Sequence, residues 1–135
     1  MNSSTATSAA ASGGIVELAG RILLALLFLY TGLGKIGAYT GTAAYMASAG
    51  LPAFLLPFVI ALEVGGSVAI IVGWRTRIVA FLLAGFTLLS ALIFHTHFAD
   101  HTQVIMFMKN VSITGGFLLL VAHGAGPLSL DARRR

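Results

Sequence analysis

The chain has 135 residues, of which 58% are hydrophobic and 9% charged, with a formal net charge of +4. Soluble domains are about 25% charged, so a chain of this length could not bury so much apolar surface in a water-soluble fold. Cysteine is absent from the sequence, which excludes disulfide exchange, thiol nucleophiles and Cys-ligated metal clusters. We therefore expect an integral membrane protein.

The first segment, MNSSTATSAAASGG over residues 1–14, contains small and polar residues and no charge. A cleaved signal peptide needs a basic region, then an apolar region, then small residues. Here the small residues come first, so we predict a disordered tail and no signal peptide.

Four apolar segments follow the tail. A bilayer core of about 30 Å requires roughly 20 apolar residues in a helix, and continuous rather than alternating apolar residues argue against a β-barrel. We therefore predict an all-α fold, a four-transmembrane-helix bundle over residues 15–123, with spans at 15–35, 53–73, 78–94 and 104–122.

One face of the first span carries two basic residues with small or apolar residues between them: Arg21, Ala25, Phe28, Gly32 and Lys35. Glu17 lies one turn before Arg21, in the order that favours an ion pair within a helix. Arg21 is therefore interpreted as a partner of Glu17 or as a side chain reaching the cytoplasmic surface, with a role in the ligand site as the alternative.

Glu63 lies near the middle of the second span, and Lys109 and Asn110 lie near the start of the fourth. A charge at mid-membrane costs roughly 2.5–3.5 kcal/mol, so Glu63 needs a partner or a proton. Counted along the helices, Glu63 lies about 15 Å deep and Lys109 about 8 Å deep from the same surface. We expect Lys109 to pair with Glu63, with Lys35 as the second candidate. A structural ion pair that sets helix register is the alternative to a ligand-binding centre.

The segment HTHFADH, residues 95–101, joins the third and fourth spans. His97 and His101 are one helical turn apart with Asp100 beside them, a spacing that could hold a metal. A polar cap at the outer membrane surface explains the segment as well, and we expect no metal. His95 lies deeper and could relay protons to the polar centre.

The basic residues of the loops gather on one side of the predicted bundle: Arg75 and Arg77 after the second span, and Arg133, Arg134 and Arg135 at the end of the chain. The positive-inside rule then places both termini in the cytoplasm and makes residues 124–135 a short basic tail. This asymmetry explains the net charge, and no basic and aromatic stripe indicates a nucleic-acid partner.

Five stretches in this order resemble the DoxX family of small bacterial membrane proteins: GRILLALLFLYTGLGKI, TAAYMASAGLP, LEVGGSVAIIVGWRTR, FMKNVSITGGFLLL and GAGPLSLD. The resemblance runs from about residue 18 to residue 131. It implies a four-helix, multi-pass protein of the bacterial plasma (inner) membrane, and it marks Arg21, Lys35, Glu63 and Lys109 as family-pattern polar positions. The family takes its name from a subunit of a thiosulfate:quinone oxidoreductase, and its members are linked to redox and quinone metabolism.

We interpret the chain as a membrane subunit that binds a quinone or a similar small molecule at an inward-facing polar centre. The candidate residues are Glu63, Lys109, Asn110, Lys35, His95 and Arg21. An enzymatic role, as a subunit of a quinone-linked oxidoreductase, stays open. Two further functions are compatible with the sequence: a noncatalytic membrane anchor for a redox partner protein, and a small transporter or proton path, which would require a homo-oligomer.

Overall fold

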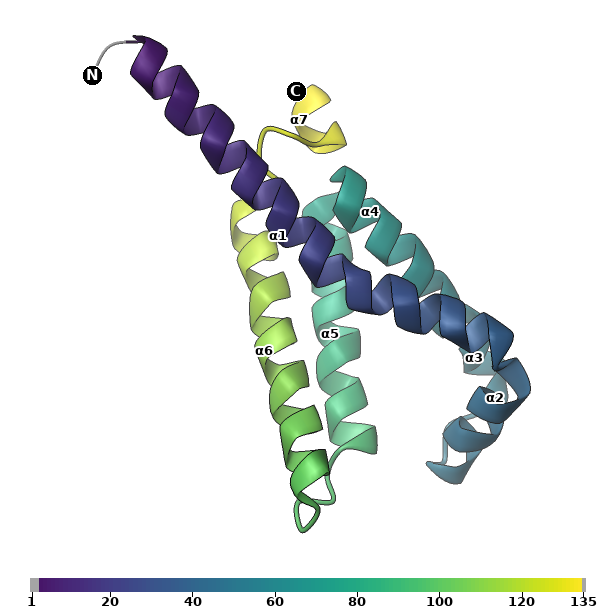
Figure 1. The fold of residues 1–135 in the computed structure, drawn as a ribbon. Coiled ribbons are helices and arrows are strands. Elements are labelled where there is room, and N and C mark those ends of the chain that lie inside the picture. Colours follow the sequence, from purple (N-terminus) through teal and green to yellow (C-terminus); the bar gives the residue numbers. More distant parts are fainter. Residues whose placement is uncertain (1–2, 135) are drawn as a thin grey trace.

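A computed structural model describes the backbone of residues 3–134 and the side chains of residues 13–134. Among these residues the chain is helical and has no strand. Four helical stretches are long and apolar enough to cross a membrane: Gly13–Gly37, Ala53–Val72, Thr76–Phe94 and His101–His123. The all-α fold with four transmembrane helices predicted from the sequence is therefore confirmed (Figure 1).

The first helix, α1, runs from Ser3 to Gly37 and is longer than its predicted span. Its backbone is helical from residue 3 onward, whereas the sequence predicts a disordered tail over residues 1–14; residues 1 and 2 lie outside the described part of the chain. Extending an existing helix adds one hydrogen bond for each residue ordered, and this segment contains several alanines and no proline, so the helix can continue beyond the membrane span.

A short helix, α2 (Tyr39–Ser48), follows α1 after a bend at Ala38. Gly50, two residues after the end of α2, has a positive φ of 82°. The backbone N–H groups of Gly50 and Leu51 donate to the carbonyls of Ala47 and Met46 at 3.0 and 2.9 Å, which is the pattern of a glycine-terminated helix. The sequence predicts no helix here, because the segment is too short and too weakly periodic to indicate one.

The second span is a continuous helix whose backbone hydrogen-bond pattern changes along its length. It consists of η1 (Ala53–Leu55), α3 (Leu56–Ile60), the π-helical turn η2 (Ala61–Gly65) and α4 (Gly66–Val72). The third and fourth spans are α5 (Thr76–Phe94) and α6 (His101–His123), and the chain ends with α7 (Leu130–Arg133). Such π-helical turns occur often at functional sites, and Glu63 lies within this one.

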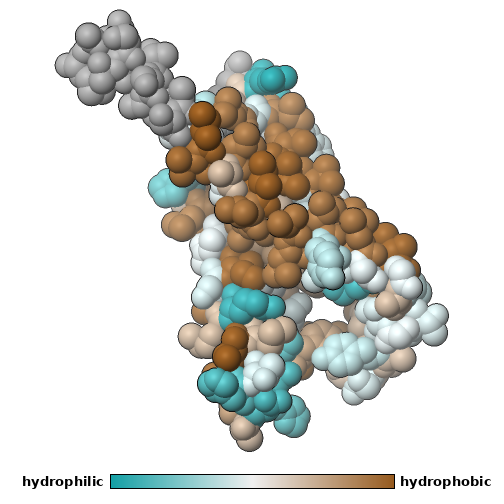
Figure 2. All heavy atoms as spheres, in the orientation of Figure 1, coloured by the Kyte–Doolittle hydropathy of each residue, from teal (hydrophilic) through white to brown (hydrophobic). Residues whose placement is uncertain are grey.

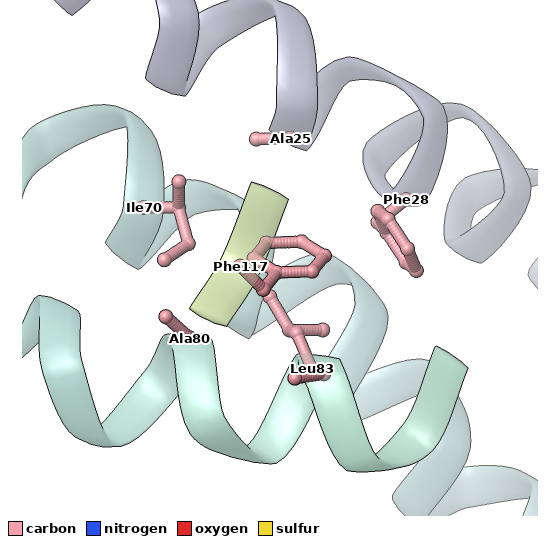
Figure 3. Close-up of a cluster of buried hydrophobic side chains, with 7 residues drawn as sticks. Ala25, Phe28, Ile70, Ala80, Leu83 and Phe117 are labelled. Carbon is pink, nitrogen blue, oxygen red and sulfur yellow. The ribbon is translucent and has the colours of Figure 1, made fainter. Parts of the chain in front are cut away.

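Helices α5 and α6 run side by side, and α1 crosses them at an angle together with α3 and α4 (Figure 1). Their contact is an apolar core of seven small and large side chains: Ala25, Phe28, Ile70, Ala80, Leu83, Ala84 and Phe117. All of them except Ala84 are labelled in Figure 3. The rings of Phe28 and Phe117 meet edge to face with centroids 5.3 Å apart. Many large hydrophobic side chains are exposed, and the upper and middle parts of the face shown in Figure 2 are largely hydrophobic, as lipid contact requires.

The segment after α6 folds back onto the bundle. Both carboxylate oxygens of Asp131 accept backbone N–H groups, from Arg75 at 2.7 Å and Thr76 at 2.9 Å. The N–H of Asp131 donates to the carbonyl of Gly73 at 2.8 Å. The α4–α5 turn and α7 therefore mark one end of the bundle, here called the terminal end (Figure 1). The opposite end carries α2 and the α5–α6 loop and is called the α2 end.

Candidate functional site

Glu63 is the most deeply buried carboxylate of the membrane domain, with a side chain 2% exposed. Lys35 Nζ donates to its Oε1 at 2.8 Å, and the hydroxyl of Thr31 donates to its Oε2 at 2.9 Å. Both donors lie on α1, one helical turn apart. Each carboxylate oxygen of Glu63 therefore has a partner from α1, which offsets part of the cost of burying the ion pair.

Gly32 makes this arrangement sterically feasible. A Cβ atom at position 32 would lie 2.8 Å from Val64 Cγ2 and 2.9 Å from Glu63 Cβ. Only glycine therefore allows α1 to approach the π-helical turn closely enough for Lys35 and Thr31 to reach the carboxylate. Small residues serve the same purpose in membrane bundles generally.

The prediction that Lys109 pairs with Glu63 is wrong. Glu63 forms its ion pair with Lys35, the second candidate. Depth along the helix axis suited both lysines, but depth does not determine which helices touch. Helix α1 packs against η2, whereas α6 packs mainly against α5. Lys109 Nζ instead lies 3.9 Å from Met106 Sδ.

A cavity of about 390 Å³ surrounds this ion pair. It is called the Glu63 cavity, and five of the six candidate residues line it: Lys35, Glu63, His95, Lys109 and Asn110. The amide nitrogen of Asn110 donates to the carbonyl of Thr87 at 3.2 Å, which holds α6 against α5. Nδ1 of His95 lies 3.1 Å from Oε1 of Gln103. Most of the remaining lining is apolar, with Leu27, Phe86 and Ile93 among it.

The Glu63 cavity lies between the apolar core and α2. Phe28 belongs both to the cavity lining and to the core cluster that contains Leu83 and Phe117. Toward the α2 end, Tyr45 and Met46 of α2 line the cavity, and the Tyr45 ring stacks on Phe94 at 5.1 Å. Figure 2 shows a notch in the surface between the α2 region and the lower part of the bundle.

Arg21, the sixth candidate, lies away from the cavity. Its side chain is 1% exposed and donates from Nη1 to the carbonyls of Ile70 and Ile71 at 3.1 and 3.0 Å, and from Nη2 to the carbonyl of Leu128. It neither reaches the surface nor forms an ion pair with Glu17 in the described part of the chain. Carbonyls at a helix C-terminus lack helical partners and favour a cation, so Arg21 joins α1, α4 and the returning C-terminal segment.

Two further residues complete this junction at the terminal end. Gly73 has a φ of 73°, and a Cβ there would lie 2.6 Å from Nη1 of Arg21. Burial raises the pKa of Asp131, but the backbone N–H groups of Thr76 and Arg75 outweigh burial and hold the pKa below its ordinary value. The GAGPLSLD motif therefore has a structural explanation in this chain.

The outer histidines do not gather around a common point. His97, Asp100 and His101 are all exposed, and Oδ1 of Asp100 accepts the N–H of Thr102 at 3.0 Å as the N-cap of α6. Within residues 13–134, no group of three His, Cys, Asp or Glu residues could hold a metal ion. The geometry assigns Asp100 to helix capping.

The sequence-based candidates leave out several residues that line the cavity, among them Thr31, Tyr45 and Ser90. Thr31 precedes Lys35 by one helical turn, so its position on the same face could have identified it. Tyr45 belongs to α2, whose packing depends on contacts that no local pattern encodes. Ser90 lies on α5 one residue before the buried Ala91, and no motif in the sequence marks it.

Comparison with known proteins relates this sequence to a family of membrane proteins. The DoxX family model matches residues 16–96. Inner membrane protein YqjF of Escherichia coli strain K12 is 52% identical over 114 residues, covering 84% of this chain and 88% of that protein. Inner membrane protein YphA of the same organism is 41% identical over 127 residues, covering 88% and 90%.

A more distant relative is "Putative oxidoreductase CatD" of Bacillus subtilis strain 168, which is 37% identical over 73 residues, or 54% of each chain. No solved structure matches this chain.

Proposed function

This chain belongs to the DoxX family, and from that premise we propose that it is a membrane subunit of redox metabolism that binds a quinone or similar small molecule in the Glu63 cavity. The chain is a multi-pass protein of the plasma membrane, as its inner-membrane relatives and its four spanning helices agree. The observation that carries the proposal is the convergence of polar side chains from α1, η2, α5 and α6 on one largely apolar cavity.

The cavity residues suit a quinone headgroup. Ligand cavities typically measure about 300–1,000 Å³ and combine apolar walls with a few placed polar groups. A quinone supplies two carbonyl oxygens that accept hydrogen bonds and take up protons when the ring is reduced. Lys109 and Ser90 offer donors to such oxygens, and the apolar side chains of the wall suit the ring.

Glu63 and His95 are the groups that could exchange protons with the bound ligand. Glu63 is held at both oxygens by α1 donors, so its position is fixed before a ligand arrives. Since the chain has no cysteine thiol to pass electrons, we expect a redox partner protein to exchange electrons with the ligand. CatD, whose name describes an oxidoreductase, supports this class of function.

The experiment is a thermal-unfolding assay of the purified protein in mild detergent, with and without a short-chain ubiquinone and menadione. We expect either quinone to raise Tm of the wild-type protein. Ser90→Leu should fill the cavity and remove this rise. Ser112→Leu is the matched control, because Ser112 lies exposed on α6 and outside the cavity lining.

Two results would reject the proposal. One is a wild-type Tm that no quinone changes, together with no quinone in the lipid extract of the purified protein; this would favour a noncatalytic anchor. The other is an equal ligand response in Ser90→Leu and Ser112→Leu, which would place binding elsewhere. A transporter is less well supported, since four spanning helices are few for a transport path without a homo-oligomer.

A further inference from the structure

Taking ligand binding in the Glu63 cavity as its premise, we infer that the cavity selects ligands with an acidic oxygen, an enolate or phenolate, whose negative charge pairs with Lys109. The inference depends on the proposed function and narrows it to a chemical class. It follows from the charged side chains that line the cavity and from which of them already have an ion-pair partner.

The titratable side chains that line the cavity are Lys35 on α1, Tyr45 on α2, Glu63 on η2, His95 after α5 and Lys109 on α6, whereas η1 and α3 contribute the apolar Leu55 and Val59. The carboxylate of Glu63 is already occupied, since Lys35 Nζ and the Thr31 hydroxyl take its two oxygens at 2.8 and 2.9 Å. Two lysines against one carboxylate leave the cavity with one positive charge when tyrosine and histidine are neutral.

That remaining charge is on Lys109. Its Nζ lies 3.9 Å from the Met106 sulfur, and a thioether is only a weak acceptor. Lys35–Glu63 is the one ion pair of the described residues. A cation within a membrane span is costly unless something compensates it. A bound anion would supply the compensation that the protein itself does not.

The walls of the cavity decide what kind of anion fits. Leu27, Leu55 and Ile93 are among its mostly apolar lining residues. A small inorganic anion would lose its hydration there and regain few hydrogen bonds. An organic anion with a flat apolar body keeps its ring against the walls and presents a single charged oxygen to Lys109. A ring enolate or phenolate has this form, and a charge-assisted hydrogen bond to lysine favours it over the neutral analogue.

The test compares two ligands that differ by one methyl group. At pH 7.5, 2-hydroxy-1,4-naphthoquinone is an anion and 2-methoxy-1,4-naphthoquinone is neutral. Affinities are measured by titration calorimetry of the full-length protein in detergent, with protein-free micelles as the blank for partitioning. We expect the wild-type protein to bind the hydroxy compound at least about tenfold more tightly.

Variants assign the preference to one side chain. Lys109→Met and Lys109→Gln should lower the affinity for the hydroxy compound more than the affinity for the methoxy compound and so abolish the preference, whereas Lys109→Arg should keep it. Two independent neutral variants guard against one that does not fold. Arg133→Met is the control for losing a cation elsewhere, because Arg133 is exposed in α7 outside the membrane spans, and it should behave like the wild-type protein.

The outcomes separate the inference from its premise. Equal wild-type binding of the two compounds would overturn the anion preference and leave quinone binding intact. A preference that survives in Lys109→Met and Lys109→Gln would overturn the role of Lys109. If neither naphthoquinone nor any other quinone binds, the proposed function and the inference both fail.

Discussion

Replacing Lys35 with methionine should destabilise the bundle because it leaves the carboxylate of Glu63 buried with Thr31 as its remaining partner. Two unit charges 2.8 Å apart attract by about 6 kcal/mol at an effective dielectric constant near 20, and most of this offsets the cost of removing both charges from water. Lys35 keeps 26% of its side-chain surface exposed. We therefore expect a loss of about 3 kcal/mol, the lower end for breaking a buried pair.

A double-mutant cycle isolates the pair. Lys35→Met, Glu63→Gln and the double variant are compared by equilibrium unfolding in mixed micelles of a mild detergent and dodecyl sulfate. The double variant should be less destabilised than the sum of the single variants, with a coupling of at least about 1 kcal/mol. A parallel cycle with Lys109→Met should give less than about 0.5 kcal/mol. Additive effects in the first cycle, or stronger coupling in the second, would refute the assignment of Lys35 as the partner.

Three further predictions concern packing, acid stability and orientation. Gly32→Ala should cost about 1–3 kcal/mol in the same unfolding assay, because its Cβ overlaps the π-helical turn; Gly34→Ala has no atom within 4 Å of its Cβ and should be tolerated, so equal effects would contradict the close approach. The pKa of Asp131 is lowered in the folded protein, so its stabilisation is present above the ordinary value of about 3.9 and is lost as the pH falls through the lower folded value. Asp131→Asn should accordingly flatten the fall in stability below about pH 4, and an unchanged slope would exclude Asp131 as its cause. Both termini should be cytoplasmic by the positive-inside rule; a periplasm-specific reporter should be silent after Arg135 and active within residues 40–48, and the reverse pattern would invert the topology.

Local properties of the sequence were sufficient to predict the membrane-spanning architecture. A bilayer fixes the length and apolar character of each span, and both quantities can be counted along the chain. The inward faces were also predictable, because helical periodicity places Glu63, Ser67 and Ile70 on one side of the second span, and all three are buried. The convergence of Lys109 and Asn110 with Glu63 on one cavity follows from the same inward orientation.

The partners of those inward side chains were decided only by tertiary structure. The sequence favoured Lys109 as the partner of Glu63, with Lys35 as the second candidate, and Lys35 becomes the partner through the close approach of α1 that Gly32 permits. Arg21 reaches helix-end carbonyls and Leu128 rather than Glu17, because the C-terminal segment folds back onto α4. Tyr45 of α2 lines the cavity and stacks on Phe94 of α5. The membrane spans depend on whether each residue is more stable in lipid or in water, which the residue type itself determines. The side-chain partners depend on contacts between segments far apart in the sequence, which no local pattern contains.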